Sequence, residues 1–225
     1  MEIKDIAEYL NIDVDKDLFL SVYNKVKSNE FNTFGKTPFE CYVLENNMTG
    51  KPTGNKEAFE PILSQHRKVH PNYQLRSTGY NTADSTKKDV YPHTDIDFYP
   101  EHPNCYNIVI PIFGNSRIDY YSYDDDEVYL PEKNAHGEWY YHEFNVQKKM
   151  GQHTPEYEKF LSDRVFGHIV VDKPILIKTD IMHRVVVTEA PRCAWVTRWI
   201  NIPAEMDYQK FKSKVESILW YIQIK

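Results

Sequence analysis

The sequence predicts a mainly β fold, an antiparallel sandwich or barrel, with helices near both ends of a single domain. Many short segments in its second half are rich in β-branched and aromatic residues and end at Pro, Gly or Asn-Ser turns. Most of them follow one another without an intervening helical pattern, which favours antiparallel pairing. At 225 residues the chain is long enough for one sizeable core. Residues 1–225 are therefore expected to form one domain.

The first third of the chain predicts helices and one strand. Apolar residues at helical spacing predict helices over 3–10, 15–26 and 56–70, and Asp15 is a possible N-cap of the second. An alternating segment predicts a strand over 38–45. His66 and His70 share a face of the last helix. The segment between them lacks the glutamate of an H-E-x-x-H zinc motif, so a solvated helix face is predicted there.

The rest of the chain predicts strands, one long insertion and a closing helix. The strands are expected at 105–113, 117–123, 167–180, 183–190 and 192–200. The insertion at 124–166 starts with an acidic loop and includes a short helix, "PEYEKFLSD". Insertions of this length between strands are often lids or substrate loops. The C-terminal helix carries Phe211, Val215, Ile218 and Ile222 on one face.

Composition excludes several classes of partner and site. The net charge is −6, from 33 acidic and 27 basic residues, which gives no overall basic surface for a phosphate backbone and disfavours nucleic acid as a partner. Cys41, Cys105 and Cys193 are too few for a disulfide framework and are expected to be small apolar fillers in a reducing compartment. No segment reaches the roughly 18 apolar residues of a membrane helix. Acidic residues stand near the N-terminus where a signal peptide needs basic ones, so no signal peptide is expected. A cytoplasmic location without membrane attachment is expected.

The segment "VYPHTDIDFYP" at 90–100 contains the first candidate metal ligands. His93, Asp95 and Asp97 alternate along an extended segment and therefore share one face. His93 and Asp95 can offer an imidazole nitrogen and a carboxylate oxygen to one ion, whereas Asp97 is expected further along, toward substrate or structure. His183, at the start of a later strand, is the best placed third ligand. Two histidines and one carboxylate leave positions open on the ion, which suits Fe(II) that must also bind a co-substrate and O2.

Two arginines follow His183 at positions from which a guanidinium can bind a carboxylate. Arg192 stands nine residues after it, where a guanidinium inside a barrel could bind a dicarboxylate co-substrate in a bidentate manner. Arg198 has the same strand parity. It is the second candidate for this role, or a contact for the substrate.

These residues together resemble the core of Fe(II)- and 2-oxoglutarate-dependent dioxygenases, and most closely the prolyl-hydroxylase-like branch. The resemblance covers about residues 74–200 and rests on the order His93, Asp95, His183, Arg192. It implies a double-stranded β-helix, a jelly-roll or cupin-like core with flanking helices. It also implies that His93, Asp95 and His183 hold Fe(II) and that Arg192 binds 2-oxoglutarate. The implied reaction couples oxidative decarboxylation of 2-oxoglutarate by O2 to hydroxylation of a small molecule or peptide, such as a prolyl or amino-acid group.

The chain also departs from that pattern, and alternatives remain open. Ala194 stands where relatives often have a serine that helps to bind the co-substrate carboxylate. Tyr80 resembles a tyrosine that often touches the co-substrate, but a packed core tyrosine is the alternative. For the whole protein, one alternative is a cupin-like metalloenzyme that does not use 2-oxoglutarate. Another is a non-catalytic β-sandwich binding module in which His93 and Asp95 form a surface ion pair.

Overall fold

The computed structural model describes most of the chain. The described residues are 2–28, 40–46, 56–69, 74–86, 91–97, 104–129, 139–140, 143–148, 150 and 154–219. In chain order the elements are η1 (Ile3–Asp5), β1 (Ala7–Tyr9), α1 (Lys16–Ser28), β2 (Glu40–Asn46), α2 (Lys56–Val69), β3 (Gln74–Ala83), β4 (Ile96–Asp97), β5 (Asn104–Tyr121), η2 (Asp125–Glu127), β6 (Val128–Tyr129), β7 (Trp139–Tyr140), β8 (Glu143–Phe144), η3 (Asn145–Lys148), α3 (Pro155–Ser162), β9 (Val165–Val170), β10 (Ile175–Lys178), β11 (His183–Ile202) and α4 (Tyr208–Leu219).

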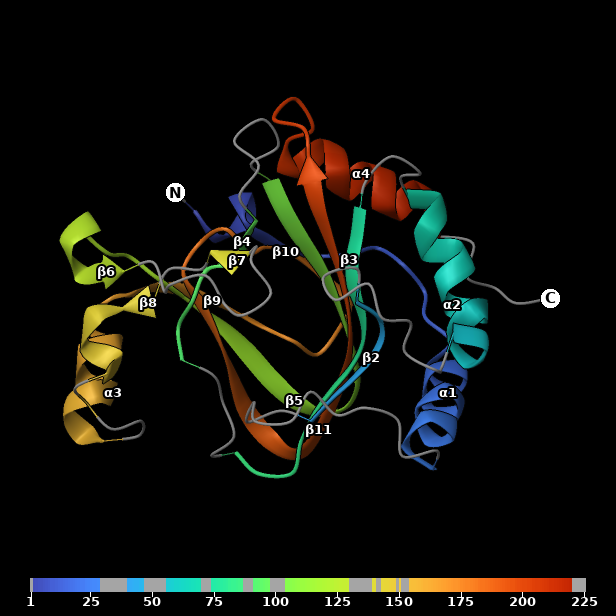
Figure 1. Ribbon diagram of the computed structural model, residues 1–225, viewed down its shortest axis with the longest axis horizontal. Coiled ribbons are helices and arrows are strands. Elements are labelled where there is room, and N and C mark those ends of the chain that lie inside the picture. Colours follow the sequence, from blue (N-terminus) through green and yellow to red (C-terminus); the bar gives the residue numbers. More distant parts are fainter. Residues whose placement is uncertain are drawn as a thin grey trace.

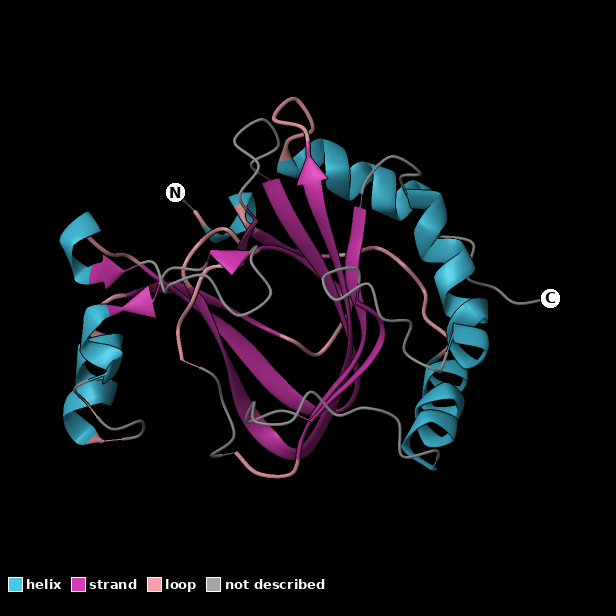
Figure 2. Cartoon of the chain, viewed as in Figure 1, coloured by secondary structure: helices cyan, strands magenta, loops and turns pink. Residues whose placement is uncertain are grey.

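One antiparallel sheet dominates the molecule. Its strand order is β1-β10-β5-β11-β3-β2, and β9 pairs with the second half of β5. The two longest strands, β5 and β11, pair along almost their whole lengths, from His183 opposite Tyr120 to Ile202 opposite Asn104. Both strands curve strongly, so the sheet folds over on itself around an interior (Figure 1). The predicted fold class is confirmed: a jelly-roll core of antiparallel strands with helices on its flanks (Figure 2).

The bend in β5 and β11 replaces the turns that the sequence analysis expected at two places. The segments predicted as 105–113 and 117–123 form one strand, and those predicted as 183–190 and 192–200 form another. Gly114 lies at the bend with φ +65°, a conformation that residues with a Cβ rarely adopt. The pairing register also shifts next to it, between Glu189 and Cys193. Bulges of this kind bend a strand without ending it.

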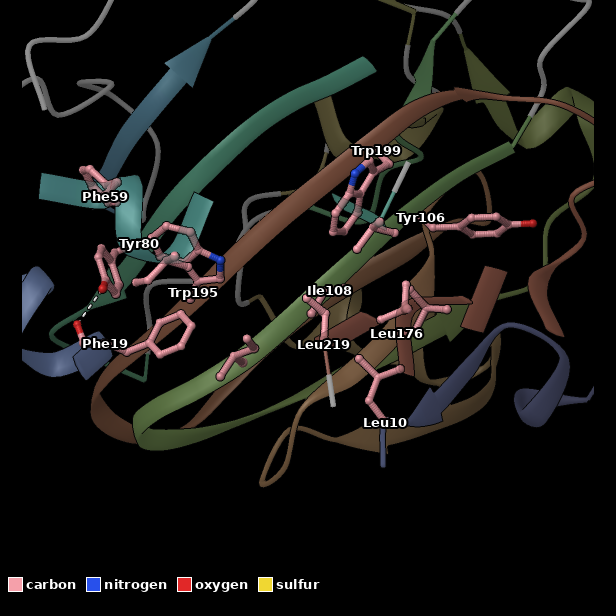
Figure 3. Packing of buried hydrophobic residues seen from close by; sticks show 14 of the residues in the cluster. Leu10, Phe19, Phe59, Tyr80, Tyr106, Ile108, Leu176, Trp195, Trp199 and Leu219 are labelled. Carbon is pink, nitrogen blue, oxygen red and sulfur yellow. Dashed lines mark hydrogen bonds between the residues drawn. The ribbon is translucent and has the colours of Figure 1, made fainter. Parts of the chain in front are cut away.

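Helices α1, α2 and α4 lie along one outer side of the sheet, and α3 lies on the opposite side of the molecule (Figure 1). The N-terminus of α1 is capped by Asp15, whose Oδ1 accepts a hydrogen bond from the Leu18 N–H at 2.9 Å. Between these helices and the sheet lies a large aromatic core (Figure 3). It contains Phe19, Phe59, Tyr80, Trp195 and Trp199, all at most 1% exposed.

The opposite face of the strands encloses a second apolar cluster, here called the inner cluster. It contains Ile6, Ala7, Val109, Ile118, Tyr120, Ile169, Val171, Ile175, Ile177 and Ala194, with Val185 and Val196 packed against it. Because side chains alternate along a strand, Trp195 and Ile108 face the helices while Ala194 and Val109 face inward. This alternation decides which side chains can reach an interior site.

The prediction of a helix over residues 3–10 is wrong. Ile3–Asp5 form one 3-10 turn, and Ala7–Tyr9 form strand β1, which pairs with Ile175–Ile177 of β10. The pairing gives the edge of β10 backbone hydrogen-bond partners and buries Ile6 and Ala7 in the inner cluster. Tertiary pairing overrides the local apolar spacing here.

The predicted solvated face of the third helix is also wrong at His66. This side chain is fully buried, lies stacked on Trp199 with ring centroids 5.9 Å apart, and donates from Nδ1 to the Ile62 carbonyl oxygen at 2.9 Å. Burial lowers the pKa of His66 to about 4. The other histidine of that pair, His70, lies outside the described residues.

Other expectations are confirmed. The predicted helices appear as α1, α2, α3 and α4, although Ile222 of the last prediction lies outside the described residues. Cys105 and Cys193 are buried and form no disulfide with each other, as expected for apolar fillers; the side chain of Cys41 is outside the described part. Among the described residues, no helix is long and apolar enough to cross a bilayer.

Candidate metal centre

Two segments far apart in the sequence bring the candidate ligands together. His93 and His183 pair directly through their backbones: each N–H donates to the carbonyl oxygen of the other, at 3.0 and 2.9 Å. The Asp95 N–H donates to the Thr179 carbonyl oxygen at 2.6 Å, next to β10. The short segment 91–97 is therefore fixed at the end of the sheet where β11 begins.

The structure places the three predicted ligands in one cluster. One ligand atom from each of His93, Asp95 and His183 lies within 4.8 Å of the others. Asp95 Oδ1 is 3.7 Å from His93 Nε2, and Asp95 Oδ2 is 4.0 Å from His183 Nε2. Neighbouring ligand atoms about 2.1 Å from an ion lie roughly 3 Å apart. Small side-chain shifts would therefore bring all three onto one ion, so the donor set fits a divalent metal.

Hydrogen bonds fix both imidazoles in the form that binds metals. His93 Nδ1 lies 2.8 Å from the Tyr91 carbonyl oxygen, and His183 Nδ1 lies 2.8 Å from the Ile181 carbonyl oxygen. A carbonyl can only accept, so each Nδ1 carries a hydrogen, and Nε2 is the nitrogen left to face an ion. Burial, with His93 beside it, lowers the pKa of His183 to about 4. His183 is therefore neutral at physiological pH, as a metal ligand must be.

Arg198 also reaches this cluster. Its Nη2 lies 2.8 Å from Asp95 Oδ2, and its side chain is 23% exposed. The guanidinium is thus in direct contact with the candidate carboxylate ligand. On strand parity alone Arg198 was the second candidate for binding a carboxylate, and the structure places it beside the cluster.

Arg192 lies elsewhere on the same face of β11. It is six residues from Arg198, or about 20 Å along an extended strand. Its side chain is buried, with Nε donating to Ser116 Oγ and Nη1 to the Asn81 carbonyl oxygen, both at 3.3 Å. Arg192 has the strand parity of inward-facing Ala194 and lies beside the bend at Gly114.

Tyr80 does not face the cluster, and the structure corrects its predicted contact with a co-substrate. Its side chain points outward into the aromatic core beneath the helices, and its hydroxyl donates to the Phe19 carbonyl oxygen at 2.5 Å (Figure 3). It packs edge-on against Trp195 at 5.0 Å. The alternative of a packed core tyrosine describes this position. Strand parity explains the difference, because Tyr80 pairs with outward-facing Trp195.

The insertion contributes a support for the cluster through α3. Arg184, next to His183 in sequence, is only 4% exposed and forms an ion pair with Glu158 of α3, with both nitrogen–oxygen distances 3.2 Å. Tyr157 of α3 packs edge-on against Tyr91, whose carbonyl oxygen holds His93. Helix α3 of the insertion thus packs beside both histidine segments. Whether the insertion is also a lid or a substrate loop stays a prediction.

Several contributors to the cluster were missing from the sequence analysis. The carbonyl oxygens of Tyr91 and Ile181 hold the imidazoles, and each belongs to the residue two before a histidine. No side-chain signal marks such a role. For Asp97 the structure describes only the backbone, which pairs with Trp139. Its side chain lies outside the described part.

Comparison with known proteins gives distant structural likenesses. No protein-family model matches this chain, and no curated protein does. Similar solved structures include HygX from Streptomyces hygroscopicus with nickel and 2-oxoglutarate bound, at 10% identity and TM-score 0.49, covering 90% of this chain and 85% of that one. They also include the non-heme alpha-ketoglutarate-dependent carbocyclase SnoK from nogalamycin biosynthesis, at 9% identity and TM-score 0.48, covering 88% and 81%.

A prolyl-4-hydroxylase from Pseudomonas putida is similar at 10% identity and TM-score 0.44, covering 90% of this chain and 96% of that one. All three likenesses fall below a TM-score of 0.5.

Proposed function

We propose that this protein is a non-haem Fe(II)- and 2-oxoglutarate-dependent oxygenase that hydroxylates a small molecule or a peptide. The observation that carries the proposal is the cluster of His93, Asp95 and His183, with both Nε2 atoms available and all three ligand atoms within 4.8 Å. Two histidines and one carboxylate on one side of an ion are typical of non-haem Fe(II) oxygenases. Bound Fe(II) would supply open coordination positions for a 2-oxo acid and O2.

The chain's own residues bind and orient in this proposal. His93, Asp95 and His183 hold the ion, and the Tyr91 and Ile181 carbonyl oxygens fix the rings. Arg192 is proposed to bind the distal carboxylate of 2-oxoglutarate, as the resemblance implies. The apolar inner cluster shields the reaction from water.

Two features bear on the alternatives. A surface ion pair between His93 and Asp95 does not fit, because Asp95 is 7% exposed and a third ligand candidate, His183, is buried beside it. A metalloenzyme without 2-oxoglutarate has the same three ligands, so only the behaviour of the 2-oxo acid separates it from the proposed enzyme.

The test is spectroscopic and needs no knowledge of the substrate. Anaerobic protein loaded with Fe(II) is expected to develop a visible metal-to-ligand charge-transfer band when 2-oxoglutarate is added. Bound iron without such a band would support the metalloenzyme that does not use 2-oxoglutarate. Failure to bind iron would support a non-catalytic module. The Asp95→Ala variant, which lacks the carboxylate ligand, is the control and should show no band.

A further inference from the structure

Two buried polar side chains and the partly exposed Arg198 lie next to the metal cluster. Arg198 of β11 is directly opposite Asn107 of β5 in the strand register. Asn107 is in turn opposite Ile177 of β10, and Thr179 follows Ile177 at the end of that strand, where its N–H donates to the Cys105 carbonyl oxygen at 3.1 Å. Arg198 and Asn107 therefore lie directly opposite each other, and Thr179, just beyond the end of β10, lies diagonally from Asn107; these three residues are here called the polar row.

The polar row faces the interior. Each of its members stands two residues from an inward-facing residue of the inner cluster: Ile177 for Thr179, Val109 for Asn107, and Val196 for Arg198. Residues two apart on a strand share a face. The row also touches the metal cluster at both ends, because the Thr179 carbonyl oxygen accepts the Asp95 N–H and Arg198 Nη2 contacts Asp95 Oδ2.

Polar atoms of the row lack the hydrogen bonds that buried groups normally make. Thr179 is 0% exposed and Asn107 is 3% exposed. Within the described part of the chain, Thr179 Oγ1, Asn107 Oδ1 and Arg198 Nε make no hydrogen bond although each atom is shielded from solvent. Buried polar groups in folded proteins are almost always hydrogen-bonded, so such a group needs a water or a ligand as its partner. Three adjacent cases beside one cluster indicate a ligand site.

We propose that the polar row is a carboxylate-binding subsite of the metal centre, and this proposal rests on the function proposed above. The Arg198 Nε–H and the Thr179 hydroxyl can donate to a carboxylate, while Asn107 Oδ1 can accept from a hydroxyl or amino group beside it. The ligand class that satisfies all three is a small organic acid with an adjacent hydroxyl or amino group.

This subsite is separate from the position of Arg192. Arg192 is 3% exposed and already donates to Ser116 and to the Asn81 carbonyl oxygen, whereas the Arg198 side chain is 23% exposed. The greater exposure of Arg198 favours a carboxylate that enters from solvent with the substrate. A carboxylate of the co-substrate has the same chemistry and is the other source.

Metal binding should strengthen the subsite. In the metal-free cluster the positive charge of Arg198 is balanced by Asp95. A divalent ion held by Asp95 neutralises that carboxylate and leaves the guanidinium free to attract another anion. Carboxylate affinity is therefore expected to rise when the ion binds.

The first experiment uses acetate as a minimal carboxylate and Mn(II) as an O2-inert paramagnetic ion. In protein loaded with Mn(II) but without 2-oxoglutarate, relaxation of the acetate methyl NMR signal should be enhanced in a saturable way. Arg198→Gln should weaken acetate binding about tenfold or more, and the isosteric Thr179→Val should weaken it severalfold. Arg117→Gln is the matched control, because Arg117 is an exposed arginine that pairs with Asp119 and has the opposite parity along β5 to inward-facing Ile118.

The second experiment identifies the source of the carboxylate. Affinities for 2-oxoglutarate and for 2-oxopentanoate, which has a methyl group in place of the distal carboxylate, are compared in Mn(II)-loaded wild type, Arg198→Gln and Arg192→Gln. If Arg198→Gln abolishes the preference for 2-oxoglutarate, the subsite takes the co-substrate. If only Arg192→Gln does so while Arg198→Gln still loses acetate, it takes the substrate.

Two results would overturn the subsite: wild type that shows no saturable acetate effect, or Arg198→Gln and Thr179→Val variants that bind acetate like wild type. Failure of the proposed function looks different. Wild-type protein would then bind no Mn(II), or would bind it without binding 2-oxoglutarate.

Discussion

At the scale of single residues, Asp95 connects the parts of the candidate site. Its carboxylate lies between two imidazoles and a guanidinium, and its backbone is fixed to Thr179. Its two oxygens face different partners, Oδ1 toward His93 and Oδ2 toward His183 and Arg198. An ion bound by this carboxylate would therefore share its charge with Arg198.

This arrangement predicts different outcomes for two neighbouring aspartates. Asp95→Ala should weaken binding of Fe(II) more than a hundredfold, because two histidines alone hold the ion poorly. Asp97→Ala should bind Fe(II) like wild type. Anaerobic titration with Fe(II), monitored by equilibrium dialysis, measures both. Loss of metal from both variants would show that the carboxylate ligand is misassigned.

His66 predicts a pH dependence of stability that is separate from the metal cluster. The pKa of His66 is about 4 in the folded protein and about 6.5 when unfolded, so between these pH values only the unfolded chain binds the proton. The contribution to stability is complete above pH 6.5 and is lost as the pH falls toward 4, by at most about 3 kcal/mol. His66→Phe should reduce this loss, measured by urea unfolding at pH 7 and pH 4.5.

The control for that measurement is His168→Phe, because His168 is exposed. It should leave the difference between the two pH values unchanged. An identical pH dependence in wild type and His66→Phe would contradict the buried, neutral state of His66.

At the scale of secondary-structure elements, α3 supports the cluster from outside the sheet. Its start is capped by Thr154, whose Oγ1 accepts the Tyr157 N–H at 3.2 Å. One face of the helix buries Tyr157 and Leu161 against Tyr121 and Met182. Met182 precedes His183, so the helix packs on the turn that leads into the ligand.

The ion pair between α3 and β11 should therefore affect metal affinity. Glu158→Gln removes the charge that faces the buried Arg184 guanidinium and should weaken Mn(II) binding severalfold, while lowering stability by about 1 kcal/mol because Glu158 is partly exposed. Lys159→Gln is the matched control. Lys159 lies on the exposed face of the same helix and pairs only with Asp163 among the described residues.

Mn(II) affinity and the urea midpoint are to be measured for both variants. A fall in stability without a fall in affinity would mean that α3 stabilises the fold and does not position His183.

At the scale of the whole molecule, the fold depends on the bend shared by β5 and β11. A Cβ on Gly114 would collide with the Pro191 carbonyl oxygen and lie 2.8 Å from the Glu189 carbonyl oxygen, in addition to the strain of φ +65°. Backbone atoms cannot move aside as a flexible side chain can. The bend therefore requires glycine at this position.

Gly114→Ala should lower the free energy of unfolding by at least about 2 kcal/mol, from strain and overpacking together. Gly167→Ala is the control, because its Cβ would meet only the flexible side chain of Ile3, and it should cost clearly less. Urea unfolding compares the two. Equal losses would show that the bend tolerates a side chain.

The sequence by itself determined the β class, four of the five helical segments that the structure bears on, and the identity of His93, Asp95 and His183 as the residues that come together. Each depends on a local pattern: apolar periodicity for the elements, and alternation plus a strand start for the cluster. The predicted helix over 3–10 failed because its pattern is short and β10 offered an unpaired edge.

The tertiary structure alone decided which side of the sheet each remaining residue faces and what it meets there. Tyr80 pairs with outward-facing Trp195 and joins the core, His66 is buried on Trp199, and Arg198 reaches Asp95. Asn107 and Thr179 carried no signal in the sequence. Strand register and the bend at Gly114 place them beside Arg198, and these are properties of pairing between distant segments that no local pattern contains.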